Sequence, residues 1–204
     1  MRTLAIETAG EACSVALFRG DELIAHGHET IGRGHAERLV PMIERLPEKG
    51  RAQEILVSLG PGSFTGVRIG LAAGRALGLV WGAVVLGYPT LALVSAIARD
   101  RGAKNVGVCV NGGHGEWFVQ SFDRDGRPVD DLSSVSPRKA LVSLAGQVVA
   151  GNRANQFAEL STETVQAIDL LADARHVPSI PRDLLTDKLS PIYGRAPDAK
   201  VPGR

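Results

Sequence analysis

Histidines, cysteines and one serine at a turn are the residues of this chain whose types could carry chemistry. His26 and His28 alternate along an expected strand, so both side chains fall on one face and could hold a metal ion. Zinc sites use three or four ligands, and no third ligand is evident near this pair. Cys13 and Cys109 lie inside apolar runs, where cysteine behaves as a small buried hydrophobe. Solvated strand histidines are the preferred interpretation, and no metal is predicted.

Ser63 lies between an expected strand and an expected helix, a position occupied by the nucleophile in some hydrolases. Residues 60–64 (GPGSF) lack the Gly-x-Ser-x-Gly pattern of such a site, and no His/Asp partner can be assigned. The turn could also cradle a phosphate on backbone N–H groups, but the Gly-Lys-Ser/Thr of a P-loop is missing. Capping of the helix by Ser63 or Thr65 explains the residues better. The sequence therefore predicts no catalytic residue and no cofactor.

The helix expected over 64–81 carries glycines at every fourth position: Gly66, Gly70, Gly74 and Gly78. Residues at this spacing form one stripe along a helix. Each glycine costs a helix interior about 1 kcal/mol relative to alanine, so close packing must compensate for the stripe. Two kinds of contact remain open, one within this chain and one with a second chain. For the second, a bulky residue at Gly70 or Gly74 is expected to abolish docking and leave the monomer folded.

The other residues of this helix are apolar nearly all round, as in a helix buried on more than one side. One side can face its own sheet, and the other then needs cover from this chain or another. Arg68 and Arg75 lie seven residues apart on one face, where they could rim such a contact.

Hydrophobic periodicity predicts alternating strands and helices along the whole chain, in a duplicated βββαβα plan. The boundary between the two halves is expected near residues 100–105. In the first half, strands are predicted at 3–7, 12–18, 23–28, 54–59 and 83–86, and helices at 35–46, 64–81 and 90–99, the last capped by Thr90. In the second half, strands are predicted at 106–110, 116–122, after the turn at 123–128, 147–150 and 164–168, and helices at 136–144, 154–160 and 169–174.

Composition fits an ordinary folded protein, with 44% hydrophobic and 22% charged residues. The formal net charge is +1, which argues against a protein that binds nucleic acid by its own electrostatics. From its first residues and apolar runs, we expect no signal peptide and no membrane span, and hence a cytoplasmic protein.

Several segments together resemble the TsaB (YeaZ-like) family. Residues 1–16 (MRTLAIETAGEACSVA) are similar to the family's opening, and residues 60–70 (GPGSFTGVRIG) to its most distinctive motif. Residues 35–41, 88–90 and 191–193 fit in order. The similarity is strong over residues 1–100 and weak afterwards.

This resemblance implies an α/β fold of the actin-like type (acetate kinase/Hsp70/actin, ribonuclease H-like) with two βββαβα lobes. The expected lobes are 1–102, which carries the partner-binding helices, and 103–204, which is smaller and ends in a proline-rich tail. The implied role is that of a non-catalytic subunit in the synthesis of threonylcarbamoyladenosine beside the anticodon of tRNAs reading ANN codons. The implied partners are a TsaD-type catalytic paralogue, a TsaE-type ATPase, a second copy when alone, and tRNA only through the complex.

The resemblance places the partner or dimer interface on the helices over 35–46 and 64–78. The expected interface residues are His35, Leu39, Met42, Ile43, Phe64, Gly66, Arg68, Gly70, Leu71, Gly74, Arg75 and Gly78.

Two positions depart from the family pattern. Glu7 stands where an aspartate is common, and Asn111-Gly112-Gly113 replaces a usual Asp-Ala-Arg. In active members of the fold, the first-strand aspartate helps to hold a magnesium nucleotide. An autonomous ATPase or small-molecule kinase is the alternative function, and Glu7 and Asn111 are poor candidates for its site. A direct tRNA-binding module is a third possibility, which the near-neutral charge disfavours.

Overall fold

The strands of the first half form one mixed sheet in the computed structural model, which describes residues 1–195. Its order is β3-β2-β1-β4-β5; β1 pairs antiparallel with β2 and parallel with β4. The tight turns after β1 and β2 make the antiparallel part, as the sequence predicts. The strands are β1 (Arg2–Glu7), β2 (Ala12–Arg19), β3 (Glu22–Thr30), β4 (Glu54–Ser58) and β5 (Val84–Tyr88).

The second half repeats this plan. Its sheet has the order β10-β9-β6-β7-β8, which read backwards is the order of the first sheet. The shared order confirms the predicted duplication and the α/β, actin-like fold. The strands are β6 (Val106–Gly113), β7 (Glu116–Phe122), β8 (Ser133–Val135), β9 (Val148–Ala150) and β10 (Ala167–Ile168).

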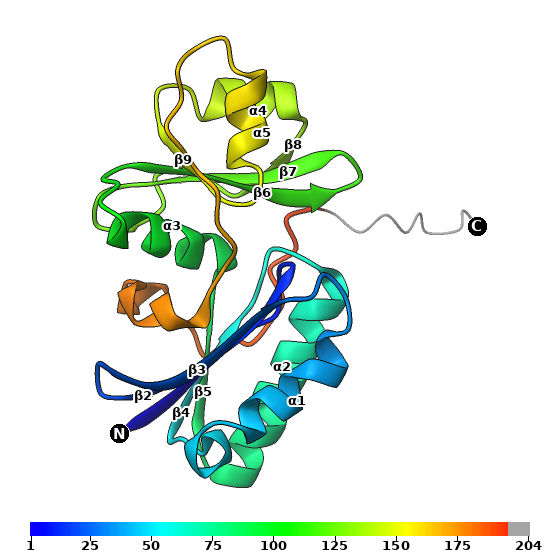
Figure 1. The fold of residues 1–204 in the computed structure, drawn as a ribbon, viewed down its shortest axis with the longest axis vertical. Helices are drawn as coiled ribbons and strands as arrows, with labels where there is room; N and C mark the ends of the chain where they lie inside the picture. Colours follow the sequence, from blue (N-terminus) through cyan, green and yellow to red (C-terminus); the bar gives the residue numbers. More distant parts are fainter. Residues whose placement is uncertain (196–204) are drawn as a thin grey trace, which may run out of the picture.

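The helices and sheets stack in five layers (Figure 1). The helices α1 (His35–Glu44) and α2 (Phe64–Trp81) cover the outer face of the first sheet. Between the two sheets lie α3 (Thr90–Asp100) and the short 3₁₀ helices η2 (Ala174–Ser179) and η3 (Arg182–Leu184). The helices α4 (Pro137–Ser143) and α5 (Ala154–Leu160) cover the second sheet.

The middle layer contains the largest core. Every residue of α3 from Thr90 to Ala98 is buried, because this helix faces a sheet on each side. Pro89, rather than the predicted Thr90, is its N-cap residue, and the Thr90 hydroxyl instead lies 2.6 Å from the Ser58 hydroxyl.

Two other local predictions are corrected by the structure. The helix predicted over 169–174 is wrong, because residues 169–173 have no regular structure. Leu170 and Ala172 point alternately into the core between the sheets, which requires an extended chain. Asp173 then caps η2 by accepting the backbone N–H of Arg175. The strand predicted over 164–168 is reduced to Ala167–Ile168.

The chain returns to the first sheet after the second is complete. Thr186 forms a backbone bridge with Gly87 at the edge strand β5, and the Ile192 N–H donates to the Leu59 carbonyl. Residues 186–195 thus form a strap along the first sheet and α2. Residues 196–204 of the proline-rich tail lie outside the described range. Within that range, no helix combines the length and apolarity that crossing a membrane needs.

Candidate functional site

An exposed apolar surface on α2 is the most prominent surface feature of the first half. Phe64, Leu79 and Val80 expose 56%, 87% and 76% of their surface. On the neighbouring α1, Val40 is 61% exposed. Exposed apolar side chains of this size make this surface a candidate for contact with another molecule. We call the surface formed by Val40, Phe64, Arg68, Ala72, Arg75, Ala76, Leu79 and Val80 the α1/α2 face.

The predicted interface residues divide into two groups in the structure. Phe64, Arg68 and Arg75 are exposed on the α1/α2 face. The others are buried within this chain, which leaves little of their surface for a partner. These are His35, Leu39, Met42, Ile43, Gly66, Gly70, Leu71, Gly74 and Gly78.

The glycine stripe packs α2 against its own sheet. A Cβ atom at Gly66 would overlap the carbonyl oxygen of Thr8, and one at Gly78 would overlap the side chain of Val85. The Thr8 hydroxyl donates to the Gly66 carbonyl at 2.8 Å, which only a residue without a side chain permits so near the strand. Of the two contacts left open by the sequence, the contact within the chain is therefore correct for the stripe. The expectation that a bulky Gly70 variant would stay folded is wrong, because its Cβ would overlap the Thr8 hydroxyl.

Sequence reasoning missed Val40, Leu79 and Val80. The available signal was their place on the wheel, since Leu79 and Val80 lie about 100° and 200° round the helix from Gly78. Once the stripe is assigned to the sheet, the apolar residues away from it must face outwards. Of the two N-terminal caps that the sequence left open, Ser63 rather than Thr65 caps α2, and its hydroxyl accepts the Gly66 N–H at 3.2 Å.

The strap lies along one edge of the α1/α2 face. The Tyr193 ring stacks on Phe64 with 5.8 Å between ring centroids, and the Arg68 guanidinium lies 3.7 Å above Phe64. Arg68 also donates to the Tyr193 hydroxyl, and Arg75 donates to the Leu189 carbonyl. Tyr193 keeps 49% of its surface exposed, so it extends the apolar surface.

A cavity of about 250 Å³ opens between the two halves of the chain, lined by residues that follow β1 and β4 and by the last residues of β6. Its walls include Gly62, Thr90, Asn111 and Asn152. Asn152 closes one side, donating to the Glu11 carboxylate and accepting from the Asn111 N–H.

Glu7 lies fully buried beneath this region. Its carboxylate accepts the Ala9 N–H at 2.7 Å and the Tyr88 hydroxyl at 3.3 Å. Burial raises the pKa of Glu7 from 4.5 to about 7, against the lowering effect of these hydrogen bonds.

These residues do not fit a magnesium nucleotide. A magnesium ligand must offer its oxygen to the ion and its waters, whereas the Glu7 carboxylate is closed off from solvent. Glu11 is the single charged side chain among the described residues that line the cavity, and its sign repels phosphate. The alternative of an autonomous ATPase or kinase therefore finds no support in this geometry.

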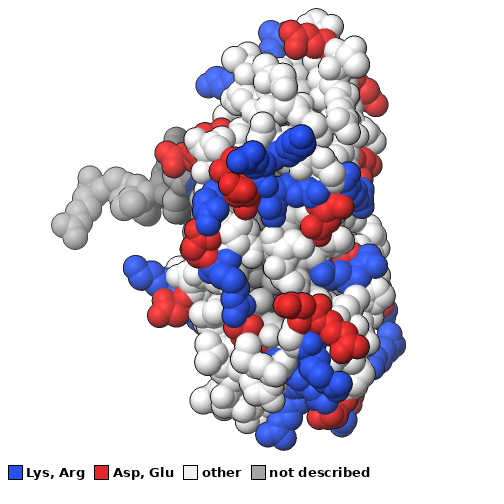
Figure 2. Space-filling model, turned by 90° about the vertical axis from the view of Figure 1, so that its left-hand side faces the viewer, with Lys and Arg blue, Asp and Glu red and all other residues white. Residues whose placement is uncertain are grey.

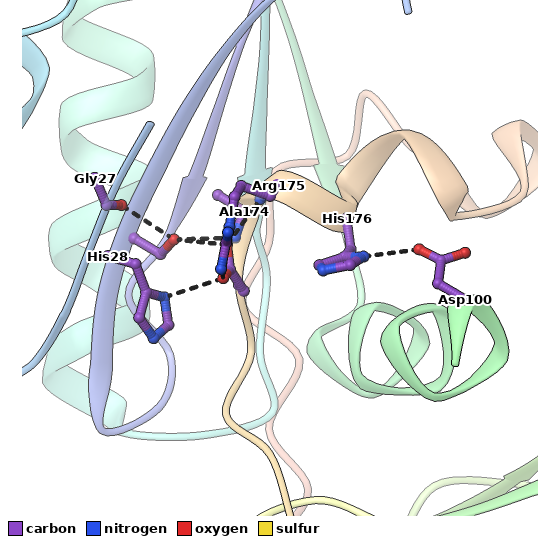
Figure 3. Close-up of polar contacts among 8 residues, drawn as sticks. Gly27, His28, Asp100, Ala174, Arg175 and His176 are labelled. Carbon is purple, nitrogen blue, oxygen red and sulfur yellow. Dashed lines mark hydrogen bonds and ion pairs between the residues drawn. The ribbon is translucent and has the colours of Figure 1, made fainter. Parts of the chain in front are cut away.

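A polar cluster joins η2 to the first sheet (Figure 3). Asp173 accepts hydrogen bonds from the Arg175 backbone and guanidinium, and its carboxylate lies 3.6 Å from the His28 ring. Burial raises the pKa of Asp173, but the hydrogen bonds from Arg175 outweigh it, and the pKa is lowered overall. His176 makes a separate 2.7 Å contact with Asp100 on α3.

Ser14, His28 and Asp173 are the residue types of a hydrolase triad, but their arrangement is different. The Ser14 hydroxyl lies 3.4 Å from Asp173 and 3.3 Å from the Gly27 carbonyl, and it is fully buried. A triad needs the serine to donate to the histidine, with the carboxylate behind that histidine. The cluster therefore anchors η2 and offers no nucleophile. Within residues 1–195, no group of three or more His, Cys, Asp or Glu side chains is arranged to bind a metal.

Known proteins resemble this chain in sequence and in fold. The family model described as "TsaD: tRNA N6-adenosine threonylcarbamoyltransferase" matches residues 28–169. The tRNA threonylcarbamoyladenosine biosynthesis protein TsaB of Escherichia coli is 38% identical over 131 residues, which cover 61% of this chain and 56% of that protein. TsaB of Haemophilus influenzae is 36% identical over 131 residues, covering 60% and 54%. The chain thus spans little more than half the length of these relatives.

Among solved structures, YeaZ from Pseudomonas aeruginosa superimposes with a TM-score of 0.81 and 27% identity. That superposition covers 94% of this chain and 99% of the other.

Proposed function

We propose a function from one premise: this chain belongs to the TsaD family and, within it, to the TsaB (YeaZ-like) family. It is a non-catalytic subunit that binds a TsaD-type enzyme and activates it for N6-threonylcarbamoylation of the adenosine beside the anticodon in tRNAs reading ANN codons. The names of the relatives point to threonylcarbamoyladenosine synthesis, and the exposed α1/α2 face supports the role of a docking subunit.

The α1/α2 face is the proposed docking surface. Its large apolar side chains are Phe64 on the first turn of α2 and Leu79 and Val80 on the last, and Arg68 and Arg75 lie along the side next to the strap. Exposed apolar side chains together with arginines are common in protein interfaces. The same face would pair two copies of this chain when the enzyme is absent. A TsaE-type ATPase would join the assembled complex, which works in the cytoplasm.

We propose that docking belongs to the first half of the chain and that the chemistry belongs to the partner enzyme. Residues 1–102 form the lobe that docks, because α1 and α2 belong to it. Residues 103–204 form the smaller lobe. The sealed Glu7 and the buried Ser14 support the assignment of the chemistry to the partner.

The test mixes this protein with the TsaD-type enzyme of the same organism and follows mass in solution together with threonylcarbamoyl transfer to tRNA. We expect a heterodimer to replace the homodimer, and transfer to require both proteins. Absence of association, or transfer that ignores this chain, would overturn the proposal.

A further inference from the structure

A second surface, remote from the α1/α2 face, gathers arginines from three separate segments. Arg99 comes from the end of α3, Arg124 and Arg127 from the turn between β7 and β8, and Arg182 from η3. They line an open groove of about 620 Å³ together with Asp125 and Asp183. We call this the arginine groove. Figure 2 shows Lys and Arg side chains at mid-height on this side of the molecule, interspersed with Asp and Glu side chains.

The groove is held in shape by its own hydrogen bonds. The Asp123 carboxylate accepts the N–H groups of Asp125 and Arg127, which fixes the turn. Gly126, with φ of 80°, packs directly on the Arg99 guanidinium, where any side chain would overlap it. Arg99 in turn donates to the Ser179 carbonyl at 2.7 Å. The arginines are therefore presented on a rigid frame.

The four arginines of the groove are set against Asp125 and Asp183 in its lining and Glu54 beside Arg182, so these groups carry only a small positive excess. Arg127 pairs with Asp183 at 3.1 Å, and Arg182 lies 3.3 Å from Glu54. Among the described residues, Arg99 and Arg124 have no carboxylate within salt-bridge distance, and the buried Nε of Arg99 has no hydrogen-bond partner. The Arg127 pair is exposed on both sides, and such pairs stabilise by about 1 kcal/mol or less, so an anion can displace or share it.

We propose that the arginine groove binds backbone phosphates of the tRNA while this chain is docked on the catalytic partner. The guanidinium group recognises phosphate by paired hydrogen bonds, and every basic side chain lining the groove is an arginine. The groove is open and charged, which suits a polymer backbone better than a protein helix that must bury apolar surface. This inference rests on the proposed function and adds a second contact for the same tRNA.

The positions of the two surfaces allow both to be occupied at once. The orange segment of η2 and η3 lies on the left-hand side of Figure 1, whereas α1 and α2 lie at the lower right. A net charge of +1 disfavours nucleic-acid binding by the isolated chain. It does not oppose a few local phosphate contacts within a larger complex, because counterion release depends on local charge.

The test uses a fluorescein-labelled transcript of a tRNA that reads ANN codons. It measures the affinity of this tRNA for the complex of this chain with the TsaD-type enzyme. The groove variant is Arg124→Gln with Arg127→Gln. The matched control is Arg138→Gln with Lys139→Gln, which removes the same charge from exposed positions on α4. Losing two phosphate contacts should weaken binding about tenfold and reduce the slope of log K against log salt by about 1 to 2. The control should change affinity by less than about twofold.

Arg99→Lys provides a second variant, because it keeps the charge and removes the planar fork. It should weaken tRNA binding several-fold, with the melting temperature of the variant as the check on folding.

The proposal would be overturned if the groove pair and the control pair changed tRNA affinity equally, or if neither changed it. It would also be overturned if the groove variant no longer bound the TsaE-type ATPase but still bound tRNA with unchanged affinity. Mass in solution separates this result from failure of the proposed function. If no heterodimer forms with the wild-type chain, the docking proposal fails, and the groove proposal, which requires the docked chain, fails with it.

Discussion

The two halves of the molecule share a strand order and differ in the helices that cover them. In the first, the outer helices have 10 and 18 residues and leave Val40, Leu79 and Val80 in solvent. In the second, α4 and α5 have 7 residues each and approach their sheet through Ala140 and Phe157, with no glycine in either helix. The same topology thus carries long outer helices on one half, with the proposed docking face, and short outer helices on the other.

The docking proposal rests on this difference in the helix surfaces, because the strand order is the same in both halves. The glycine stripe of α2 serves its own sheet, and the opposite side of the same helix forms the α1/α2 face. The two sides of α2 can therefore be tested separately.

The largest expected effect concerns the inner side of α2. Gly66→Ala should lower the free energy of unfolding by about 3 to 4 kcal/mol, because the new methyl group overlaps the Thr8 carbonyl. Gly74→Ala is the matched control: its Cβ would sit 3.6 Å from Val57, an ordinary contact, and helix propensity should add up to about 1 kcal/mol. Urea denaturation measures both. Equal and small effects would show that the stripe does not determine the packing of α2.

The next prediction concerns the pH dependence of stability that Glu7, at the end of β1 in the first sheet, should cause. Because the pKa of Glu7 is raised to about 7, the native state keeps a proton that the unfolded chain releases from about pH 4.5. The stability from Glu7 is therefore full below pH 4.5 and is lost as the pH rises to about 7. Glu7→Gln should remove this dependence and add on the order of 3 kcal/mol at pH 8.

Urea denaturation of the wild type and Glu7→Gln at pH 5 and pH 8 provides the measurement. A variant that loses stability equally at both values would show that the carboxylate is needed in its charged form.

A smaller effect is expected where η2 is anchored to the first sheet. Asp173→Asn should lower the free energy of unfolding by about 2 kcal/mol at pH 7, because the charge-assisted hydrogen bonds from Arg175 are lost. The pKa of Asp173 is lowered, so its contribution is present above pH 3.8 and disappears as the pH falls through the lowered pKa. Chemical denaturation between pH 3 and pH 7 measures the difference. A difference of the same size at pH 3 and pH 7 would contradict this origin.

The sequence predicted most of the fold because its signals are local. Apolar runs of five to eight residues between turns gave β1, β2 and β4, and helical spacing gave α1 and α2 with nearly the observed limits. The helix prediction for 169–174 was wrong because Leu170 and Ala172 are buried in a core that forms only when distant parts of the chain come together. A window of six residues cannot show this long-range contact.

The candidate site was only partly predictable. Periodicity showed that α2 has two apolar sides, but which side meets the sheet depends on Thr8 and Val85, from distant strands. Phe64, Arg68 and Arg75 were placed correctly on the outside, and Leu79 and Val80 were not recognised. The arginine groove had no sequence signal, because its arginines come from three separate segments.

The most direct test of the account compares one substitution on the two halves. Val80 on α2 and Val142 on α4 are 76% and 79% exposed, so Val80→Glu and Val142→Glu should both fold normally. The measurement is the affinity for the TsaD-type enzyme, from mass in solution across a dilution series. Docking through the α1/α2 face predicts a loss of at least about tenfold for Val80→Glu, close to 1.4 kcal/mol, and less than about twofold for Val142→Glu. Unchanged affinity for Val80→Glu, or a larger loss for Val142→Glu, would contradict docking through this face.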